Sequence, residues 1–358
     1  MTLPTLRTRL VLIAAVLLLV VPALLALLAE NGDDDGFEDG RDRQATSAEC
    51  RPTKLLEPPC GAWFGAFVPH EKENLPEKVA AYEKDMGRSL DIVYTYHDMS
   101  TRDNEGQLLT KQEQEVGKDR MLLLSWESKD WGANGGKKHK WIKWRDIAAG
   151  ELDEKVIDPQ AKRVAEYGER TGKKVFLSFD LEMDTRMKNG TAKEFRDAWQ
   201  HIHQRFKAAG ADNVIWTWII TGYLDHAELF TELYPGDQFV DWVGYNKYNY
   251  YRCHQTDWQS FADLQLPTYQ WVTENITDKK PLMLSEYGSA QDTAKTGRQA
   301  DWYAEVPEVL KRMPQVKAAL QWNSRDPGPH CDLSLQNDDA VDALKKAGDD
   351  PYFKQPLP

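Results

Sequence analysis

Short apolar runs alternate with amphipathic segments along this chain from about Cys60 onward. Apolar runs of about 4–8 residues are typical of buried parallel strands, and the amphipathic segments are typical of helices that cover a sheet. Eight runs are expected to form strands, at 61–68, 90–96, 120–126, 174–179, 213–219, 239–245, 281–285 and 316–322. Eight strand–helix units are the number that closes a (β/α)8 TIM barrel, which is the fold we predict.

The clearest helices are expected at 76–86, 158–171, 192–209 and 298–313. Thr191 and Glu194 have the spacing of a capping box at the start of the third helix, and Gly210 is typical of its end. An open doubly wound sheet is the alternative architecture, but no glycine-rich phosphate-binding turn follows the first expected strand. No internal repeat of about 20–50 residues is present, which argues against a solenoid.

Two connections, 99–119 and 127–152, are long, polar and contain glycine. Long loops at the active face of a barrel usually shape a cleft. The second contains Trp131, Trp141 and Trp144 among lysines. These rings either line a cleft or pack beneath their own loop, and the sequence favours neither interpretation.

The first 29 residues are expected to be a signal anchor or a signal peptide. Residues 10–29 are uncharged and mostly apolar, follow Arg7 and Arg9, and are long enough for a helix to span a bilayer. Residues 30–48 are expected to be a disordered acidic linker, and residues 49–358 the single catalytic domain. We therefore expect an extracellular protein, either anchored at the cell-surface membrane or secreted, and acting as a monomer.

Charge and cysteine content narrow the possible partners. The formal net charge of −12 argues against a nucleic-acid partner, because phosphate binding needs clustered basic residues. Four cysteines in an oxidising compartment predict two disulfides with three possible pairings. Proximity in sequence favours Cys50–Cys60, which leaves Cys253–Cys331. The spacing matches no zinc site, and we expect no metal and no cofactor.

Two glutamates, Glu182 and Glu286, each close an apolar run expected to be a strand. The active site of a TIM barrel lies at the C-terminal ends of its strands. Two carboxyl groups that face each other there are the machinery of glycoside hydrolysis, one as an acid and one as an ionised carboxylate. Glu182 and Glu286 are therefore the predicted catalytic residues, and the predicted substrate is a polysaccharide.

Other polar and aromatic residues near the expected strand ends are candidates for holding the sugar. Tyr248 is placed to hydrogen-bond the carboxylate of Glu286, and Trp322 offers a flat floor for a sugar ring. Asp98 and Glu127 are possible ligands of sugar hydroxyls. The remaining predicted substrate-binding residues are Asp180, Trp126, Trp218 and Asn246.

Several stretches between residues 60 and 335 resemble glycoside hydrolase family 26, best known for β-mannanases among retaining barrel enzymes. They are FDLEMD (179–184), GADNVIWTW (210–218), YPGD (234–237) with VDWVG (240–244), and KPLMLSEYG (280–288). The resemblance implies that Glu182 is the acid/base, Glu286 the nucleophile and Tyr248 its partner. The family usually has histidine where this chain has Leu181, and an apolar neighbour is expected to raise the pKa of Glu182 by desolvation.

Together these features predict a retaining endo-β-glycanase that hydrolyses a β-1,4-linked polysaccharide. Mannan is the default substrate by resemblance, with glucan and exopolysaccharide as alternatives. A second hypothesis is a barrel that binds cell-surface glycan without cleaving it, and a third is a structural envelope protein. The third predicts that no cleft is lined by Trp and Tyr.

Overall fold

The computed structural model describes residues 51–358 except 59, 72, 103–105, 133–138 and 326–330. The segment predicted at 1–29 and the linker predicted at 30–48 lie outside the described residues. Within the part that is described, no helix is both long and apolar enough to cross a membrane.

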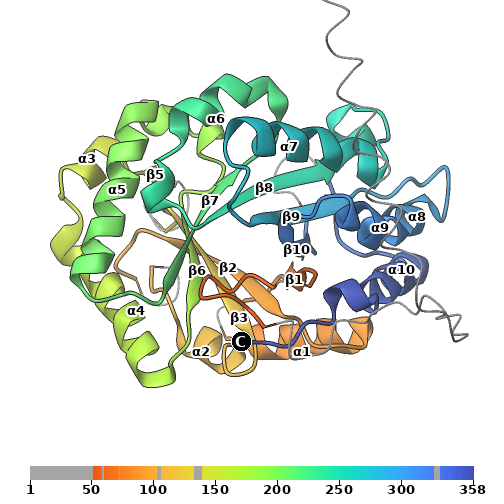
Figure 1. The fold of residues 1–358 in the computed structure, drawn as a ribbon, viewed down its shortest axis with the longest axis horizontal. Coiled ribbons are helices and arrows are strands. Elements are labelled where there is room, and N and C mark those ends of the chain that lie inside the picture. The colour runs from red at the N-terminus through yellow and green to blue at the C-terminus, as the bar shows by residue number, and fades with distance from the viewer. Residues whose placement is uncertain (1–50, 59, 72, 103–105, 133–138, 326–330) are drawn as a thin grey trace, which may run out of the picture. The chain divides into compact units, whose positions relative to one another are not determined.

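Eight parallel strands close a barrel, which confirms the predicted fold (Figure 1). The first and last strands pair with each other, so the sheet has no free edge. The strands are β1 (Trp63–Phe67), β2 (Ile92–Asp98), β3 (Met121–Glu127), β6 (Val175–Phe179), β7 (Val214–Ile220), β8 (Trp242–Asn249), β9 (Leu282–Ser289) and β10 (Val316–Trp322). A small antiparallel hairpin, β4 (Lys129–Asp130) with β5 (Lys140–Trp141), follows β3.

Helices surround the barrel (Figure 1). They are α1 (Leu75–Met86), α2 (Lys111–Val116), α3 (Trp144–Ala148), α4 (Asp158–Thr171), α5 (Ala192–Ala208), α6 (Ala227–Leu233), α7 (Phe261–Asn275), α8 (Arg298–Ala304), α9 (Val306–Lys311) and α10 (Asp338–Gly348). The capping box of Thr191 and Glu194 begins α5 as predicted. The single helix expected at 298–313 is instead α8 and α9. Pro307 has no N–H to donate, and its ring clashes with the carbonyl four residues earlier, which interrupts the helix.

Two separate apolar cores lie inside and outside the barrel. Successive strand residues point to opposite faces of the sheet, so each strand contributes to both cores. Trp63, Tyr94, Leu123, Phe176 and Trp242 belong to the barrel interior. Their neighbours Phe64, Val93, Leu124, Leu177 and Val243 belong to the layer between the strands and the helices. Strand side chains with the inward parity reach the mouth of the barrel, and a register shift between Leu284 and Glu286 of β9 brings Glu286 there as well.

The two ends of the barrel differ. At the N-terminal ends of the strands, residues 51–58 cover the interior, where the indole N–H groups of Trp63 and Trp242 donate to the carbonyl oxygens of Leu56 and Leu55. At the other end, β8 and β9 extend beyond their predicted limits and pair with each other up to Asn249 and Ser289. This end is therefore where a ligand site is expected.

Candidate active site

A cleft of about 610 Å³ opens at the C-terminal ends of the strands. Its acidic residues are Glu127, Glu182 and Glu286, which come from β3, the turn after β6, and β9. Its aromatic residues are Phe67, Tyr96, Trp131, Trp141, Tyr248, Tyr250 and Trp322. Sugar sites commonly combine carboxylates with flat apolar rings in this way, because each sugar ring has both hydroxyl groups and an apolar face.

Glu286 lies inside β9 instead of at its end, and it is 5% exposed. Its Oε1 accepts a hydrogen bond of 2.8 Å from the hydroxyl of Tyr96, and its Oε2 accepts one from the hydroxyl of Tyr248. Burial and the negative charge of Glu182 raise the pKa of Glu286 to about 8, against the lowering effect of these hydrogen bonds. Tyr248 therefore makes the contact that its position in the sequence predicted.

Glu182 follows β6 on a backbone turn with φ of 53°, in the left-handed region that non-glycine residues seldom adopt. Its N–H donates to the carbonyl of Ile219 at 2.8 Å, and its Oε1 accepts from Asn246 Nδ2 at 2.9 Å. Burial raises the pKa of Glu182, while Asn246 and the charge of Arg186 oppose that increase. The direction agrees with the desolvation expected beside Leu181, whose side chain belongs to the barrel interior.

Asn246 fixes the arrangement of the two carboxyl groups. It pairs with Glu286 across β8 and β9, and its Oδ1 accepts from Ser285 Oγ at 2.7 Å. That acceptor contact orients the amide so that Nδ2 points at Glu182. Asn246 is almost fully buried, so its place is between the glutamates and not on the open surface of the cleft. Because burial and the charge of Glu182 raise the pKa of Glu286 to about 8, the pair retains a proton at neutral pH.

Asp180 does not line the cleft, although the sequence predicts it as a substrate ligand. Its side chain is 0% exposed. Its oxygens accept hydrogen bonds from Ser128 N and Oγ, from Trp144 Nε1 at 2.6 Å, and from Arg186 Nη1 at 3.0 Å. These donors occupy both oxygens and leave no face for a sugar hydroxyl. Asp98 is likewise fully buried, with its oxygens bound to Ser100, Arg102 and the backbone N–H of Trp131.

Trp126 and Trp218 also do not reach the cleft, although the sequence predicts both as substrate ligands. Each is 0% exposed and belongs to the core between strands and helices. Trp126 packs against Phe206 of α5, and Trp218 packs against Tyr234. Both occupy the outward parity of their strands, so their rings point away from the barrel interior. Trp322 does line the cleft, where it stacks on Phe67 and donates to the hydroxyl of Tyr96 at 3.1 Å.

The sequence did not single out Tyr96 or Arg186. Arg186 forms an ion pair with Asp180 at 3.0 Å and another with Glu127. Burial opposes ionisation of Glu127, but the charges of Arg186 and Lys129 lower its pKa overall. Tyr96 has the inward parity of β2, two residues after the interior residue Tyr94, and that parity is the signal that could have found it.

Of the three tryptophans after β3, two line the cleft and one packs beneath its own loop. Trp131 and Trp141 line the cleft, and the Nε1 of Trp131 donates to Glu127 at 2.9 Å. Trp144 is fully buried against Phe195 beneath the loop.

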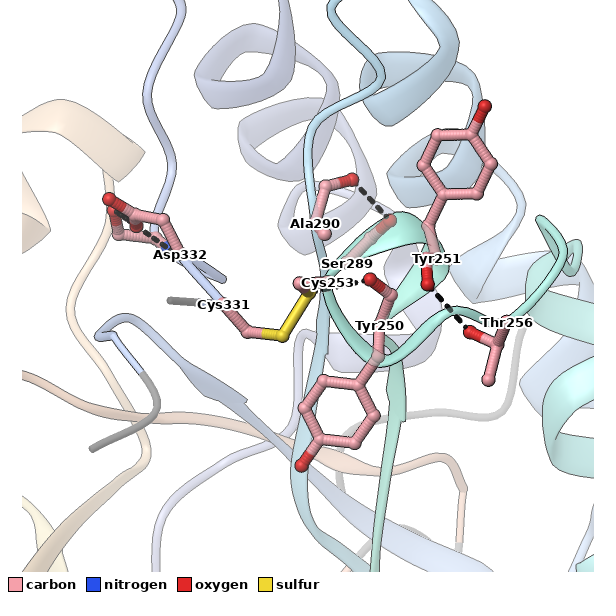
Figure 2. Close-up of a disulfide and its surroundings, with 9 residues drawn as sticks. Tyr250, Tyr251, Cys253, Thr256, Ser289, Ala290, Cys331 and Asp332 are labelled. Atoms are coloured by element: carbon pink, nitrogen blue, oxygen red, sulfur yellow. Dashed lines mark hydrogen bonds between the residues drawn. A yellow bond between two sulfur atoms is a disulfide. The ribbon is translucent and has the colours of Figure 1, made fainter. Parts of the chain in front are cut away.

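A disulfide joins Cys253, after β8, to Cys331, after β10. Figure 2 shows the bridge beside Tyr250 and close to Ser289 and Ala290 at the end of β9. The same small apolar cluster contains Tyr248 and Trp322, so the bridge supports one wall of the cleft. The second predicted bridge, Cys50–Cys60, includes Cys50, which lies outside the described residues.

A model of glycosyl hydrolase family 26 matches residues 185–319, which include Tyr248 and Glu286 and begin just after Glu182. Endoglucanase H of Acetivibrio thermocellus is 24% identical over 281 residues, which cover 73% of this chain and 27% of that protein. The chain is a homologue of the family 26 glycoside hydrolases. A β-1,3-xylanase from a Vibrio species is 26% identical to this chain over 145 residues, which cover 40% of this chain and 28% of that enzyme.

Solved structures agree on the fold of this family 26 homologue. A family 26 β-mannanase of Bacteroides ovatus superposes with a TM-score of 0.59 at 17% identity, covering 82% of this chain and 90% of that one. The family 26 domain of a Prevotella bryantii endo-β-mannanase/endo-β-glucanase gives 0.58 at 13% identity, with the same coverage. This chain matches little more than a quarter of the length of either curated relative.

Replacing Tyr248 with Phe is expected to lower kcat/KM by about 10- to 100-fold, because a hydrogen bond to a charged group contributes about 1.5–3 kcal/mol. The hydrogen bond from the Tyr248 hydroxyl lowers the pKa of Glu286. Its removal should therefore raise that pKa and shift the acidic limb of the pH–rate profile to higher pH. Tyr234→Phe is the matched control, because that hydroxyl binds Asp237 outside the cleft. Equal profiles for Tyr248→Phe and the wild type would contradict the assignment.

Replacing Cys253 and Cys331 together with Ser is expected to lower the free energy of unfolding by about 2–5 kcal/mol, since the bridge closes a loop with a sequence separation of 78. KM should also rise, because the bridge supports the wall that contains Tyr248 and Trp322. Denaturant unfolding and steady-state kinetics measure the two effects. An unchanged unfolding midpoint would contradict a structural role for the bridge.

Proposed function

We propose that this protein is a retaining endo-β-glycanase that hydrolyses a β-1,4-linked polysaccharide. Glu286 acts as the nucleophile and Glu182 as the acid/base. The observation that carries the proposal is the meeting of these two carboxyl groups in one aromatic cleft, with Glu286 held by two tyrosine hydroxyls. Hydrolysis with retention needs this pair, one group ionised and one protonated.

In the first step, an oxygen of Glu286 attacks the anomeric carbon while Glu182 donates its proton to the leaving glycosidic oxygen. The products are a covalent glycosyl–enzyme and the released chain with a new hydroxyl group. The reaction needs Glu286 ionised and the pair's proton on Glu182, although burial and the charge of Glu182 raise the pKa of Glu286 in the free protein. Hydrogen bonds donated by Tyr96 and Tyr248 favour the ionised form of Glu286, and positive charge developing at the anomeric carbon favours it further.

In the second step, Glu182, now ionised, removes a proton from a water molecule that attacks the anomeric carbon and breaks the bond to Glu286. The sugar keeps its original configuration, and both carboxyl groups return to their starting state. Asn246 donates to Glu182 throughout and keeps it aimed at the reacting oxygen. Glu127, held by Arg186 and Lys129, is not needed for either proton transfer.

Mannan is the first substrate to test. Several solved structures with this fold are described as β-mannanases, and the curated relatives are an endoglucanase and a β-1,3-xylanase. Trp322 offers its ring as the floor for the sugar beside the glutamates. Leu181 has no hydrogen-bonding group where the family usually has histidine, so a sugar hydroxyl there would lack that partner.

The experiment is reducing-sugar release by the full chain from β-mannan, glucomannan, mixed-linkage β-glucan, β-1,4-xylan and β-1,3-xylan. NMR of the first product formed would report its anomeric configuration. Activity on one polymer with retained configuration supports the proposal, and inverted configuration would overturn the mechanism. Binding without any cleavage would favour the alternative, a glycan-binding barrel.

We also propose that the protein acts outside the cytoplasm as a monomer, either anchored or secreted. A disulfide such as Cys253–Cys331 persists in oxidising compartments, and the proposed catalytic pair is complete within one chain. Cell fractionation and size-exclusion chromatography would test these two points.

A further inference from the structure

Basic side chains gather on the wall of the cleft formed by the β4–β5 hairpin and the segment after Glu182. The ammonium groups of Lys188 and Lys129 lie over the ring of Trp141, at 3.8 and 4.5 Å from its centroid. Lys129, His139, Trp141 and Lys188 all line the cleft. Lys143 reaches the same place, since its Nζ donates to the carbonyl oxygen of Lys188 at 2.5 Å.

These basic groups are not all neutralised by protein carboxylates. Lys129 and Arg186 share Glu127, and Arg186 also binds Asp180. Lys188 is exposed, and within the part of the chain that is described no ion pair joins its ammonium to a carboxylate. Its ring contact with Trp141 holds the ammonium over the cleft wall but leaves its charge without an anionic partner.

The local charge contrasts with that of the whole protein. The formal net charge is −12, yet at the cleft wall Lys129, Arg186 and Lys188 offset the charges of Glu127, Asp180 and a glutamate pair that retains a proton. A neutral sugar is bound by hydrogen bonds and ring stacking, and an ammonium can donate to its hydroxyl groups but exerts no net charge attraction on it. An anionic group gains both a charge-assisted hydrogen bond and long-range attraction into the cleft.

We infer that the cleft takes an anionic β-glycan, and that Lys188, beside Trp141, binds a carboxylate or sulfate group carried by that polymer. The inference rests on the proposed function, because it names the substrate class of the same cleft. The anionic group would lie against the Lys188 wall, while the bond to be cleaved lies between Glu182 and Glu286.

The test compares three polymers with one backbone: glucomannan, its carboxymethylated derivative and its sulfated derivative, prepared from the same batch. Binding is measured by affinity electrophoresis with the full chain carrying Glu286→Gln, which is not expected to cleave the polymer. We expect at least about 5-fold tighter binding to one or both anionic derivatives than to glucomannan at low salt. The preference should shrink as salt is raised, because ions screen the attraction. A protein of net charge −12 should otherwise repel a polyanion.

Variants of Lys188 test the site itself. Adding Lys188→Gln should remove most of the preference for the anionic polymer, and Lys188→Arg should keep it. Lys162→Gln is the matched control, since Lys162 is an exposed lysine of α4 that pairs with Glu166 away from the cleft. Tighter binding to only the carboxymethylated or only the sulfated polymer would identify the anionic group.

The outcomes separate this inference from the proposed function. Equal or weaker binding to both anionic derivatives would overturn the inference, as would a preference that survives in Lys188→Gln. If the wild-type protein still cleaves a neutral polymer, the proposed function stands in either case. If the wild-type protein binds the anionic polymers through Lys188 but cleaves none of the polymers tested, the hydrolase assignment fails and the binding site remains.

Discussion

Glu286→Gln is expected to abolish polysaccharide hydrolysis, with a fall in kcat on the order of 10⁴-fold or more, as is typical when a nucleophile is removed. An amide oxygen is too weak a nucleophile to form the glycosyl–enzyme. The variant still offers an oxygen to accept a hydrogen bond from Tyr96 or Tyr248, so the cleft should keep its shape. Reducing-sugar release from the polymer that the wild type cleaves is the measurement.

The same variant should be more stable than the wild type at neutral and mildly alkaline pH. The pKa of Glu286 is raised from its ordinary value of 4.5 to about 8 in the folded protein. Between these pH values the unfolded chain releases a proton that the folded chain retains, so the wild type loses stability as pH rises. Gln does not ionise and avoids this loss. The gain in Tm should be small at pH 5 and reach a few degrees by about pH 8.

The two readouts together make the test of Glu286 decisive. Loss of activity with a raised Tm excludes unfolding as the cause. Residual activity within about 10-fold of the wild type would exclude Glu286 as the nucleophile. A Tm gain that does not grow with pH would contradict the raised pKa, whatever the activity.

Glu182→Ala is expected to lower kcat/KM on the polysaccharide by about 10²- to 10⁴-fold, the usual contribution of a general acid. The expected loss is far smaller for formation of the glycosyl–enzyme from an aryl β-glycoside whose phenol leaves without a proton. The covalent intermediate should then accumulate, because no base activates water. A burst of phenol followed by a slow steady state measures this behaviour.

Azide provides the sharper check on Glu182. It attacks the intermediate without needing a base, so it should restore turnover of the aryl glycoside and give a β-glycosyl azide. Glu166→Ala is the matched control, because Glu166 is an exposed acid on α4 outside the cleft. Equal losses on the polysaccharide and the aryl glycoside, with no response to azide, would contradict the acid/base role.

Much of the fold could be predicted from sequence periodicity. All eight expected strands are present, because a strand buried on both faces needs an unbroken apolar run. The bounds of β8 and β9 were less predictable. Their last residues, 246–249 in β8 and 286–289 in β9, are mostly polar and include a glycine. Taken alone, these segments do not resemble a buried strand. They remain extended because each pairs with the other strand, a contact that no local pattern reports.

The candidate site was less predictable than the barrel. Tyr248 and Trp322 lie in the cleft near Glu286, whereas Trp126, Trp218 and Asp180 lie at strand ends but point elsewhere. Position along a strand is readable from the sequence to within a few residues. The direction of a side chain reverses with each residue along a strand. An error of one residue in the assigned register therefore assigns a side chain to the cleft when it lies in the outer core.

The sequence by itself determined the barrel and the two glutamates at its active face, since apolar periodicity and the position of an acid after a run are local properties. Only the tertiary structure decided which groups surround them. Tyr96 reaches Glu286 across 190 positions of sequence, and Asn246 reaches Glu182 across 64. Barrel closure brings these strands together, and the hydrogen bonds, burial and mutual repulsion that set the pKa values of the pair follow from that closure alone.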